Sequence, residues 1–227
     1  MTATISAAIA MDRMYRHQRH IYDLTRKFYL LGRNRLIKQL GPEANDCVLE
    51  IGCGTGRNLI WAAGLYPQAR YFGIDVSREM LFSAQESIAR TKLSSRVTVR
   101  HADATEFDPL SVLGRPQFER IFISYSLSMI PEWRSVIAKA VSLLAPAGEL
   151  HIVDFGSQEG LPDWFRSALR CWLTWFHVTP CDDLELTLKA FVGPGRASLN
   201  YERPSRGYSQ LATLKKTSQL SRPTREG

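Results

Sequence analysis

The stretch that decides the fold prediction is Val48-Leu49-Glu50-Ile51-Gly52-Cys53-Gly54-Thr55-Gly56. It begins with the residue types of a buried strand and ends in three alternate glycines before a predicted helix. Glycine adopts positive φ readily and lets a ligand approach the backbone, while the first turn of a helix presents N–H groups that have no partner within the helix. The stretch therefore predicts a nucleotide-binding turn between a strand and a helix.

A second predicted strand, Tyr71-Phe72-Gly73-Ile74-Asp75, ends in an acid about 20 residues after the glycines, where doubly wound nucleotide folds place a ribose-binding carboxylate. The dinucleotide pattern G-x-G-x-x-G would need a glycine at the position of Arg57. A pyrophosphate also needs the helix N-terminus free of negative charge, and Glu50 precedes the turn. A nicotinamide or flavin cofactor is therefore disfavoured, and a cationic ligand is favoured.

The pattern E-x-G-x-G-x-G at residues 50–56, with Asp75 after the second strand, resembles motif I and its successor in class I S-adenosylmethionine-dependent methyltransferases. The resemblance implies S-adenosyl-L-methionine as the cofactor, with its methionine part in the glycine turn, its ribose on Asp75 and its adenine beside Asp103 and Ala104. A tight strand-helix turn without a ligand is the alternative. The predicted cofactor-binding residues are Glu50, Gly52, Cys53, Gly54, Gly56, Asp75, Val76, Met80, Asp103, Ala104 and Ser124.

Length and composition limit the protein class. The 227 residues fit one α/β domain, and a hydrophobic content of 44% is ordinary for a globular protein. The four cysteines form no C-x-x-C pair, so we expect no metal site and a reduced, cytoplasmic setting. The N-terminal residues have the wrong polarity for a signal peptide, and no apolar stretch reaches the ~20 residues that cross a bilayer. Any membrane contact is therefore expected to be peripheral, at the inner face of the cytoplasmic membrane.

The formal charge of +7 is concentrated at the two ends of the chain. Residues 11–40 carry eight bases and two acids, and residues 196–227 carry seven bases and two acids, so the remainder is slightly acidic. This distribution indicates an anionic partner, for which we expect an anionic membrane surface, at roughly 1 kcal/mol per basic residue near the surface. The marks of known nucleic-acid modules are missing from the sequence, so no nucleic acid is expected.

Predicted strands and helices alternate along the chain, which favours an α/β fold, and the resemblance implies that it is the Rossmann-like class I methyltransferase fold. We expect a doubly wound, mostly parallel seven-stranded sheet with an antiparallel C-terminal hairpin. The single domain at 1–227 would comprise a basic helical lid at 1–43, a core at 44–214 and a disordered tail at 215–227. The predicted strands are 46–51, 70–75, 96–101, 118–125, 150–155, 197–202 and 207–214, the helices are 19–41, 56–65, 77–90 and 132–144, and a turn is expected at 146–148.

Aromatic and aliphatic positions recur at helical spacing between Trp164 and His177, a segment that holds three of the five tryptophans. Tryptophan favours the boundary between apolar and wet regions, and Arg166 and Arg170 would face anionic headgroups in an interfacial helix. Packing of this helix on the sheet is the alternative, because aromatic stripes at this spacing are usually core.

The N-terminal helix places Tyr15, Tyr22 and Tyr29 at seven-residue intervals, a row that can hold a methylated ammonium by cation–π attraction. Amphipathic packing is the alternative. His17 is a weaker candidate that would accept a proton from an amine. Tyr125 follows the fourth strand, at the sheet edge where substrates meet cofactors, and its alternative is a loop tyrosine bonded to backbone.

Residues 11–38, and Phe176-His177-Val178-Thr179-Pro180 with Asp182-Asp183-Leu184, resemble bacterial diacylglycerylhomoserine N-methyltransferases, whereas Cys181 departs from the basic residue expected there. The resemblance implies that the lipid's homoserine amine is methylated three times to form a betaine lipid. The resulting catalytic candidates are Tyr22, Tyr125 and His17, and the substrate-binding candidates are Tyr15, Arg26, Tyr29 and Arg33, the two arginines because bidentate pairing suits a planar carboxylate.

Other functions remain open from the sequence. A phosphatidylethanolamine or a quinone-biosynthesis methyltransferase is next in the same class. A noncatalytic S-adenosylmethionine-binding or RNA-binding module would also explain basic ends. A nicotinamide-dependent oxidoreductase is the last alternative.

Overall fold

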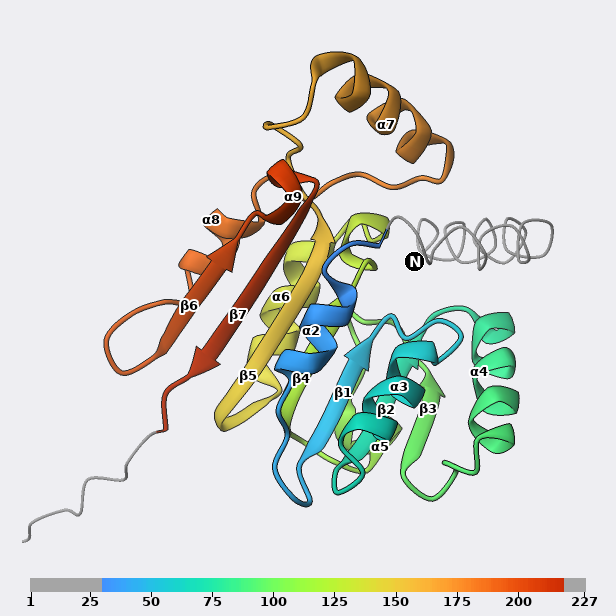
Figure 1. Ribbon diagram of the computed structural model, residues 1–227. Helices are drawn as coiled ribbons and strands as arrows, with labels where there is room; N and C mark the ends of the chain where they lie inside the picture. The colour runs from blue at the N-terminus through green and yellow to red at the C-terminus, as the bar shows by residue number, and fades with distance from the viewer. Residues whose placement is uncertain (1–29, 219–227) are drawn as a thin grey trace, which may run out of the picture.

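The computed structural model describes residues 30–218 as one seven-stranded sheet with helices on both faces (Figure 1). The strand order is β3-β2-β1-β4-β5-β7-β6. The first five strands pair in parallel, and β7 pairs antiparallel with both β5 and β6. The predicted fold class is confirmed. The strands are β1 (Cys47–Ile51), β2 (Arg70–Asp75), β3 (Val97–His101), β4 (Phe118–Ser124), β5 (Leu144–Phe155), β6 (Ala197–Glu202) and β7 (Ser209–Lys216).

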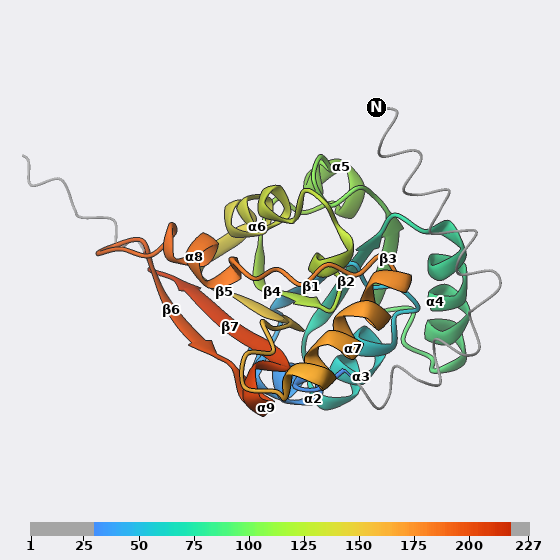
Figure 2. The ribbon, with the colours of Figure 1, turned by 90° about the horizontal axis from the view of Figure 1, so that it is seen from above.

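The sheet divides the core into two layers, and helices cover each of them (Figure 2). Side chains alternate between the faces of a strand, so in β1 Leu49 packs in one layer and Val48 in the other. Both faces are apolar because the crossover helices of a parallel sheet cover both of them. One layer takes buried residues from α2 (Arg33–Gln39), α3 (Arg57–Leu65) and α4 (Arg78–Arg90), and the other from α5 (Pro109–Leu113), α6 (Trp133–Ser142) and α8 (Leu184–Lys189).

The strands β1, β2, β3, β4 and β5 all end at the same edge of the sheet, where α7 (Asp163–Trp175) lies over them in both ribbon views (Figures 1 and 2). The short η1 (Leu127–Met129) follows β4 at this edge, and α9 (Pro204–Gly207) joins β6 to β7. Leu173 of α7 is buried in the layer formed with α2, α3 and α4. The carboxyl edge of the sheet is therefore covered by an additional helix.

The structure corrects the prediction of one long helix at 19–41. Residues 30–32 are not helical, and α2 begins at Arg33 after Gly32, whose φ is +83°. This positive φ favours glycine, and a Cβ on Gly32 would also lie 2.7 Å from Leu211 Cδ1 of β7. Leu36 and Ile37 of α2 are buried in the core. The earlier part of the predicted lid, residues 1–29, lies outside the described residues.

Other boundaries also differ from the prediction. β5 begins at Leu144, six residues early, because the predicted turn is an irregularity within the strand, with Ala147 at φ +61° and a register shift against β4. β7 continues to Lys216 in the predicted tail, where Lys216 Nζ donates a hydrogen bond to the Leu144 carbonyl. The short helices α5 and α8 were not predicted.

Candidate active site

The glycine turn after β1 has the predicted conformation. Gly52, Gly54 and Gly56 have φ values of +73°, +51° and +71°. The N–H groups of Gly52 and Cys53 both donate to the Ile74 carbonyl of β2, at 2.9 and 3.0 Å. A Cβ on Gly52 would lie 2.5 Å from the Ser126 Cβ. Backbone angle and lack of space therefore both require glycine at position 52.

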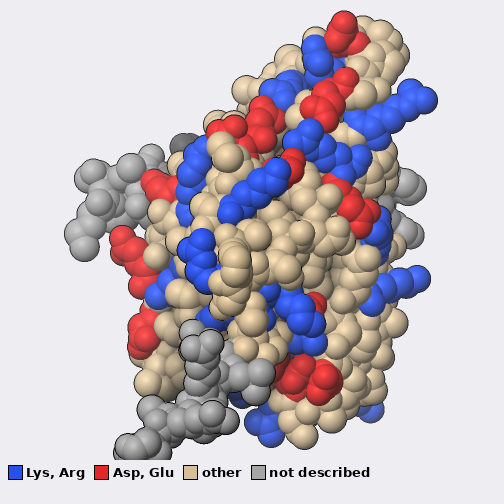
Figure 3. All heavy atoms as spheres, turned by 90° about the vertical axis from the view of Figure 1, so that its left-hand side faces the viewer, with Lys and Arg blue, Asp and Glu red and all other residues tan. Residues whose placement is uncertain are grey.

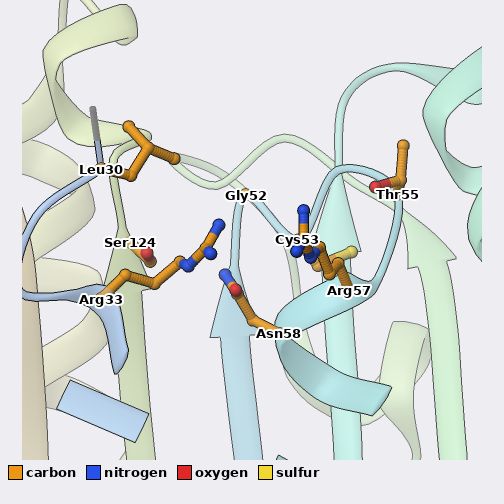
Figure 4. Close-up of a pocket in the computed structure, with 8 residues that line it drawn as sticks. All are labelled: Leu30, Arg33, Gly52, Cys53, Thr55, Arg57, Asn58 and Ser124. Atoms are coloured by element: carbon orange, nitrogen blue, oxygen red, sulfur yellow. The ribbon is translucent and has the colours of Figure 1, made fainter. Parts of the chain in front are cut away.

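A pocket opens beside this turn (Figure 4). Its empty space is about 420 Å³, counting the opening to solvent. Ser124 at the end of β4 is buried, and its hydroxyl has no hydrogen-bond partner within residues 30–218, so it is available to a ligand. The pocket is lined by Leu30, Arg33, Gly52, Cys53, Thr55, Arg57, Asn58 and Ser124, with the Arg33 and Asn58 side chains extending toward each other.

Glu50 places a buried carboxylate beneath the pocket. It is 1% exposed, and its Oε1 accepts a hydrogen bond of 2.7 Å from Asn58 Nδ2 in the first turn of α3. The pair fixes the Asn58 amide at the pocket wall and places a buried carboxylate behind a lining that also holds the guanidinium groups of Arg33 and Arg57. Asn58 was missed in the sequence analysis, although a polar residue in the first turn after the glycines is the available signal.

Asp75 connects the glycine turn to the beginning of α4. Its Oδ2 accepts from the Gly54 N–H at 2.7 Å, and its Oδ1 accepts from the Ser77 N–H at 2.9 Å. These two hydrogen bonds fix the orientation of the carboxylate beside the turn. Ser77 in turn caps α4 by accepting from the Met80 N–H at 3.3 Å. The structure thus joins Asp75 directly to the predicted cofactor turn.

The predicted adenine-binding residues, Asp103 and Ala104, follow β3, and the predicted cofactor-binding residues Val76 and Met80 follow the neighbouring strand β2. Asp103 Oδ1 accepts from the Thr105 N–H and hydroxyl, at 2.8 and 2.6 Å. Met80 is buried against Met129 and Phe176, which puts an apolar surface there. Val76 and Ala104 are both half-buried. An apolar surface beside a carboxylate has the chemistry that adenine binding needs, since the ring is flat and apolar and its amine donates hydrogen bonds.

Cys53 lines the pocket but is not a reactive residue. Its thiol is buried, and burial, followed by the charges of Asp75 and Glu50, raises its pKa well above the ordinary value. The thiol therefore stays protonated, and a protonated thiol is a poor nucleophile.

Tyr125 has the backbone-bonded arrangement that the sequence left as an alternative. It adopts φ +56°, its ring packs edge-to-face on Phe155 at 4.8 Å, and its hydroxyl donates to the Leu31 carbonyl. Burial, followed by the Asp154 charge, raises the pKa of Tyr125 well above its ordinary value. The contact holds the Leu30–Arg33 segment against the pocket, and a catalytic role for Tyr125 stays a prediction.

Asp154 is fully buried at the end of β5, and its carboxylate accepts hydrogen bonds from backbone N–H groups. Its Oδ2 accepts from the Ser128 N–H at 3.1 Å, and its Oδ1 accepts from the Phe155 N–H at 2.7 Å. Burial raises its pKa to about 6. Asp154 therefore fixes η1 to the sheet. The remaining predicted catalytic and substrate-binding residues, Tyr15, His17, Tyr22, Arg26 and Tyr29, lie outside the described residues.

Comparison with known proteins agrees with this geometry. Residues 48–148, which include the glycine turn, Asp75, Asp103 and Ser124, match the family model described as "Methyltransferase domain". The matched residues make up a little under half of the chain. The fold is that of class I methyltransferases, and the cofactor of the domain is S-adenosylmethionine.

Two curated relatives and one solved structure illustrate the similarity. O-methyltransferase cnsE of Penicillium expansum is 28% identical over 134 residues, which cover 57% of this chain and 47% of that protein. A demethylmenaquinone methyltransferase of Listeria monocytogenes is 25% identical over 139 residues, which cover 61% of this chain and 56% of that protein. The chain thus spans about half the length of these relatives. An O-methyltransferase family protein from Burkholderia thailandensis has the same fold, with a TM-score of 0.68, 16% identity and coverage of 90% of this chain and 62% of that one.

Among residues 30–218, no helix combines the length and apolarity needed to cross a bilayer. The same residues contain no group of three or more histidine, cysteine or acidic side chains placed to hold a metal ion.

Proposed function

We propose that the methyltransferase domain methylates the amine of diacylglycerylhomoserine, three times, to form the betaine lipid diacylglyceryl-N,N,N-trimethylhomoserine at an anionic membrane surface. One observation carries the proposal: of the two segments that resemble diacylglycerylhomoserine N-methyltransferases, the first lines the pocket and the second packs on Met80, a predicted cofactor-binding residue. Leu30 and Arg33, both within the first segment, line the pocket. In the second, Phe176 packs on Met80, and the Thr179 N–H donates to the Ser128 carbonyl at 2.7 Å.

The residues at the pocket suit transfer to an amine. When bound, S-adenosylmethionine supplies a methyl group on a cationic sulfonium, and the Glu50 carboxylate lies beneath the pocket that would hold it. Methyl transfer is an in-line displacement, so the main task of the protein is to align a neutral amine with the methyl carbon. Each of the first two products must lose a proton before it reacts again. His17 and Tyr22 stay our candidates for accepting that proton.

A direct test supplies the purified protein with S-adenosylmethionine that carries a labelled methyl group and with vesicles that contain diacylglycerylhomoserine. We expect labelled lipid with one, two and three added methyl groups by mass spectrometry. The Asp75→Asn variant is the negative control, because it removes an acceptor oxygen from the ribose site. Absence of labelled lipid in a preparation that binds S-adenosylmethionine by calorimetry would contradict the lipid assignment.

Arg33 offers a sharper test, because its guanidinium can pair with a carboxylate on either the lipid headgroup or the methionine part of the cofactor. Lysine keeps the charge and loses the planar fork. If Arg33 holds the lipid, Arg33→Lys raises the KM for diacylglycerylhomoserine roughly tenfold or more, as expected for a lost charged hydrogen bond, with little change in cofactor Kd. Arg57→Lys is the matched control, since Arg57 lines the same pocket. A change confined to the cofactor Kd would assign Arg33 to the cofactor instead.

A quinone is the second candidate substrate, favoured by the similarity to demethylmenaquinone methyltransferases. The same vesicle assay with demethylmenaquinone in place of the lipid distinguishes the two. Phosphatidylethanolamine vesicles provide the third arm, because that headgroup offers an amine without a carboxylate. If either compound is methylated in preference to diacylglycerylhomoserine in a direct competition, that compound becomes the assigned substrate.

A further inference from the structure

The helix α7 has a core-facing side and an opposite side with no described partner in the core. At 100° per residue, Leu173 points to the core, and Trp164, Ala168, Cys171 and Trp175 lie together on the opposite side. Leu173 is 1% exposed, whereas Trp164 is 73% exposed and Trp175 is 75% exposed. We call these four residues the outer face of α7. Its two tryptophans are eleven residues apart, about 16 Å along the helix.

The inner side of the same helix is well anchored. Leu169, Trp172 and Phe176 pack against the buried layer that contains Leu173, and the Trp172 and Phe176 rings lie 4.9 Å apart. The helix therefore has enough core contact to hold it in place without burial of the two outer tryptophans. Large exposed apolar side chains gathered on one face usually mark an interaction surface.

We propose that the outer face of α7 docks on the surface of a lipid bilayer. This inference rests on the proposed function, because a diacyl lipid must be taken from a membrane. Tryptophan rings favour the headgroup level of a bilayer, and an apolar helix face with polar flanks lies in the plane of the interface. Docking through this face turns the carboxyl edge of the sheet, with the cofactor pocket, toward the bilayer (Figures 1 and 2).

The available area favours a bilayer over a second copy of the chain. A tryptophan presents about 250 Å², so the two outer rings at three quarters exposure offer ~190 Å² each. Phe165 at the flank, 37% exposed, adds about 70 Å². The total of about 450 Å² is well below the ~800 Å² that each partner contributes to a standard protein interface. Insertion of two rings into a bilayer needs no matching protein surface.

Charge adds little to this surface. Arg166 forms an ion pair with Asp163 at 2.9 Å, and Arg170 forms one with Asp182 at 3.1 Å. The side of the molecule in Figure 3 shows basic and acidic side chains interspersed, without a large region of one sign. Docking through the outer face is therefore mainly apolar, and its contribution to binding changes little with salt.

The test compares the full chain with its Trp164→Ser/Trp175→Ser variant in co-sedimentation with vesicles of phosphatidylcholine and phosphatidylglycerol. The matched control is Leu110→Ser/Leu186→Ser, which removes two exposed apolar side chains, 59% and 72% exposed, from α5 and α8. We expect the partition coefficient to fall about tenfold or more in the tryptophan variant and less than about twofold in the control. Calorimetric binding of S-adenosylmethionine, unchanged in both variants, shows that each is folded.

The outcomes separate this inference from the proposed function. Vesicle binding that is equal in wild type and tryptophan variant, or absent in both, overturns docking even if diacylglycerylhomoserine is methylated. A dimer in solution that the tryptophan variant converts to monomer also overturns it. Vesicle binding that depends on the two tryptophans, without methylation of any lipid, supports docking and rejects the substrate. If both hold, the tryptophan variant loses activity on vesicles and keeps it on a water-soluble short-chain diacylglycerylhomoserine.

Discussion

Replacing Gly52 with alanine should destabilise the protein through two separable effects. With φ at +73°, a residue that has a Cβ costs about 1–2 kcal/mol in the left-handed region. The new Cβ would also lie 2.5 Å from Ser126 Cβ and 2.6 Å from Ser126 Oγ, an overpacking that costs about 1–3 kcal/mol. The free energy of unfolding should therefore fall by about 2–5 kcal/mol, a large share of the ~5–15 kcal/mol of a typical domain.

Other glycines in the chain provide the controls for this change. Gly114 has φ +68° and no described atom within 4 Å of a built Cβ, so Gly114→Ala isolates the backbone cost of about 1–2 kcal/mol. Gly64 lies in α3 with open space and no positive φ, so Gly64→Ala should stabilise the protein by about 0.5–1 kcal/mol. Ser126→Gly removes both crowding atoms, and in a double-mutant cycle it should recover about 1–3 kcal/mol of the Gly52→Ala loss.

The measurement is urea unfolding with the m-value compared across variants, followed by calorimetric titration with S-adenosylmethionine. Because Gly52 lines the pocket, we expect weaker cofactor binding by Gly52→Ala in addition to its lower midpoint. If Gly52→Ala and Gly114→Ala lose equal stability, the steric part of the reasoning is refuted. If Gly52→Ala unfolds like wild type, the backbone part is refuted as well.

Three further predictions concern the acids and the tyrosine of the site. Asp75→Asn should raise the Kd for S-adenosylmethionine about tenfold or more, because one acceptor oxygen is replaced by an amide donor that faces the Gly54 or Ser77 N–H. An unchanged Kd by calorimetry would contradict this prediction. Burial raises the pKa of Asp154 from 3.8 to about 6. The contribution of Asp154 to stability is therefore fully present below about pH 4 and falls by about 3 kcal/mol as the pH rises to about 6. Urea unfolding across this range should show that fall in wild type and not in Asp154→Asn. Tyr125→Phe removes the hydrogen bond to the Leu31 carbonyl and should lower the free energy of unfolding by about 1 kcal/mol. A kcat reduced by less than about tenfold indicates that Tyr125 only positions the Leu31 segment, and a larger loss supports the predicted catalytic role.

The parts of the site that were predicted from sequence are those determined by neighbouring residues in the chain. The glycine turn needs positive φ at alternate positions, and the terminal acid of β2 follows from an apolar strand that ends at Asp75. Ser77 caps α4 as its residue type and position indicate. Each of these features depends on a few consecutive residues, which is why the sequence was sufficient.

The features that were missed depend on contacts between distant segments. The helix at 19–41 was predicted through Gly32 because apolar spacing continues across it, whereas Gly32 has a positive φ and lies close to Leu211, 179 residues later in the chain. The Tyr125 hydroxyl bonds the Leu31 carbonyl, 94 residues earlier. Neither contact leaves a local pattern. The helix α5 did carry a signal, since Asp108 caps it and Pro109 begins it, but it has only 5 residues.

The structure also changes how the charge distribution bears on membrane attraction. Sequence counting assigned the basic excess to the ends of the chain, yet two of those bases pair with acids of the central region. Arg203 bonds Glu159 and Glu185 at 2.7 and 2.9 Å, and Lys215 bonds Glu149 at 2.9 Å. Such surface pairs add little stability, but they cancel much of the local positive field that would act on an anionic surface. Among residues 30–218 the membrane docking that we propose therefore rests mainly on apolar contact, for which α7 presents the two most exposed tryptophans of this part of the chain.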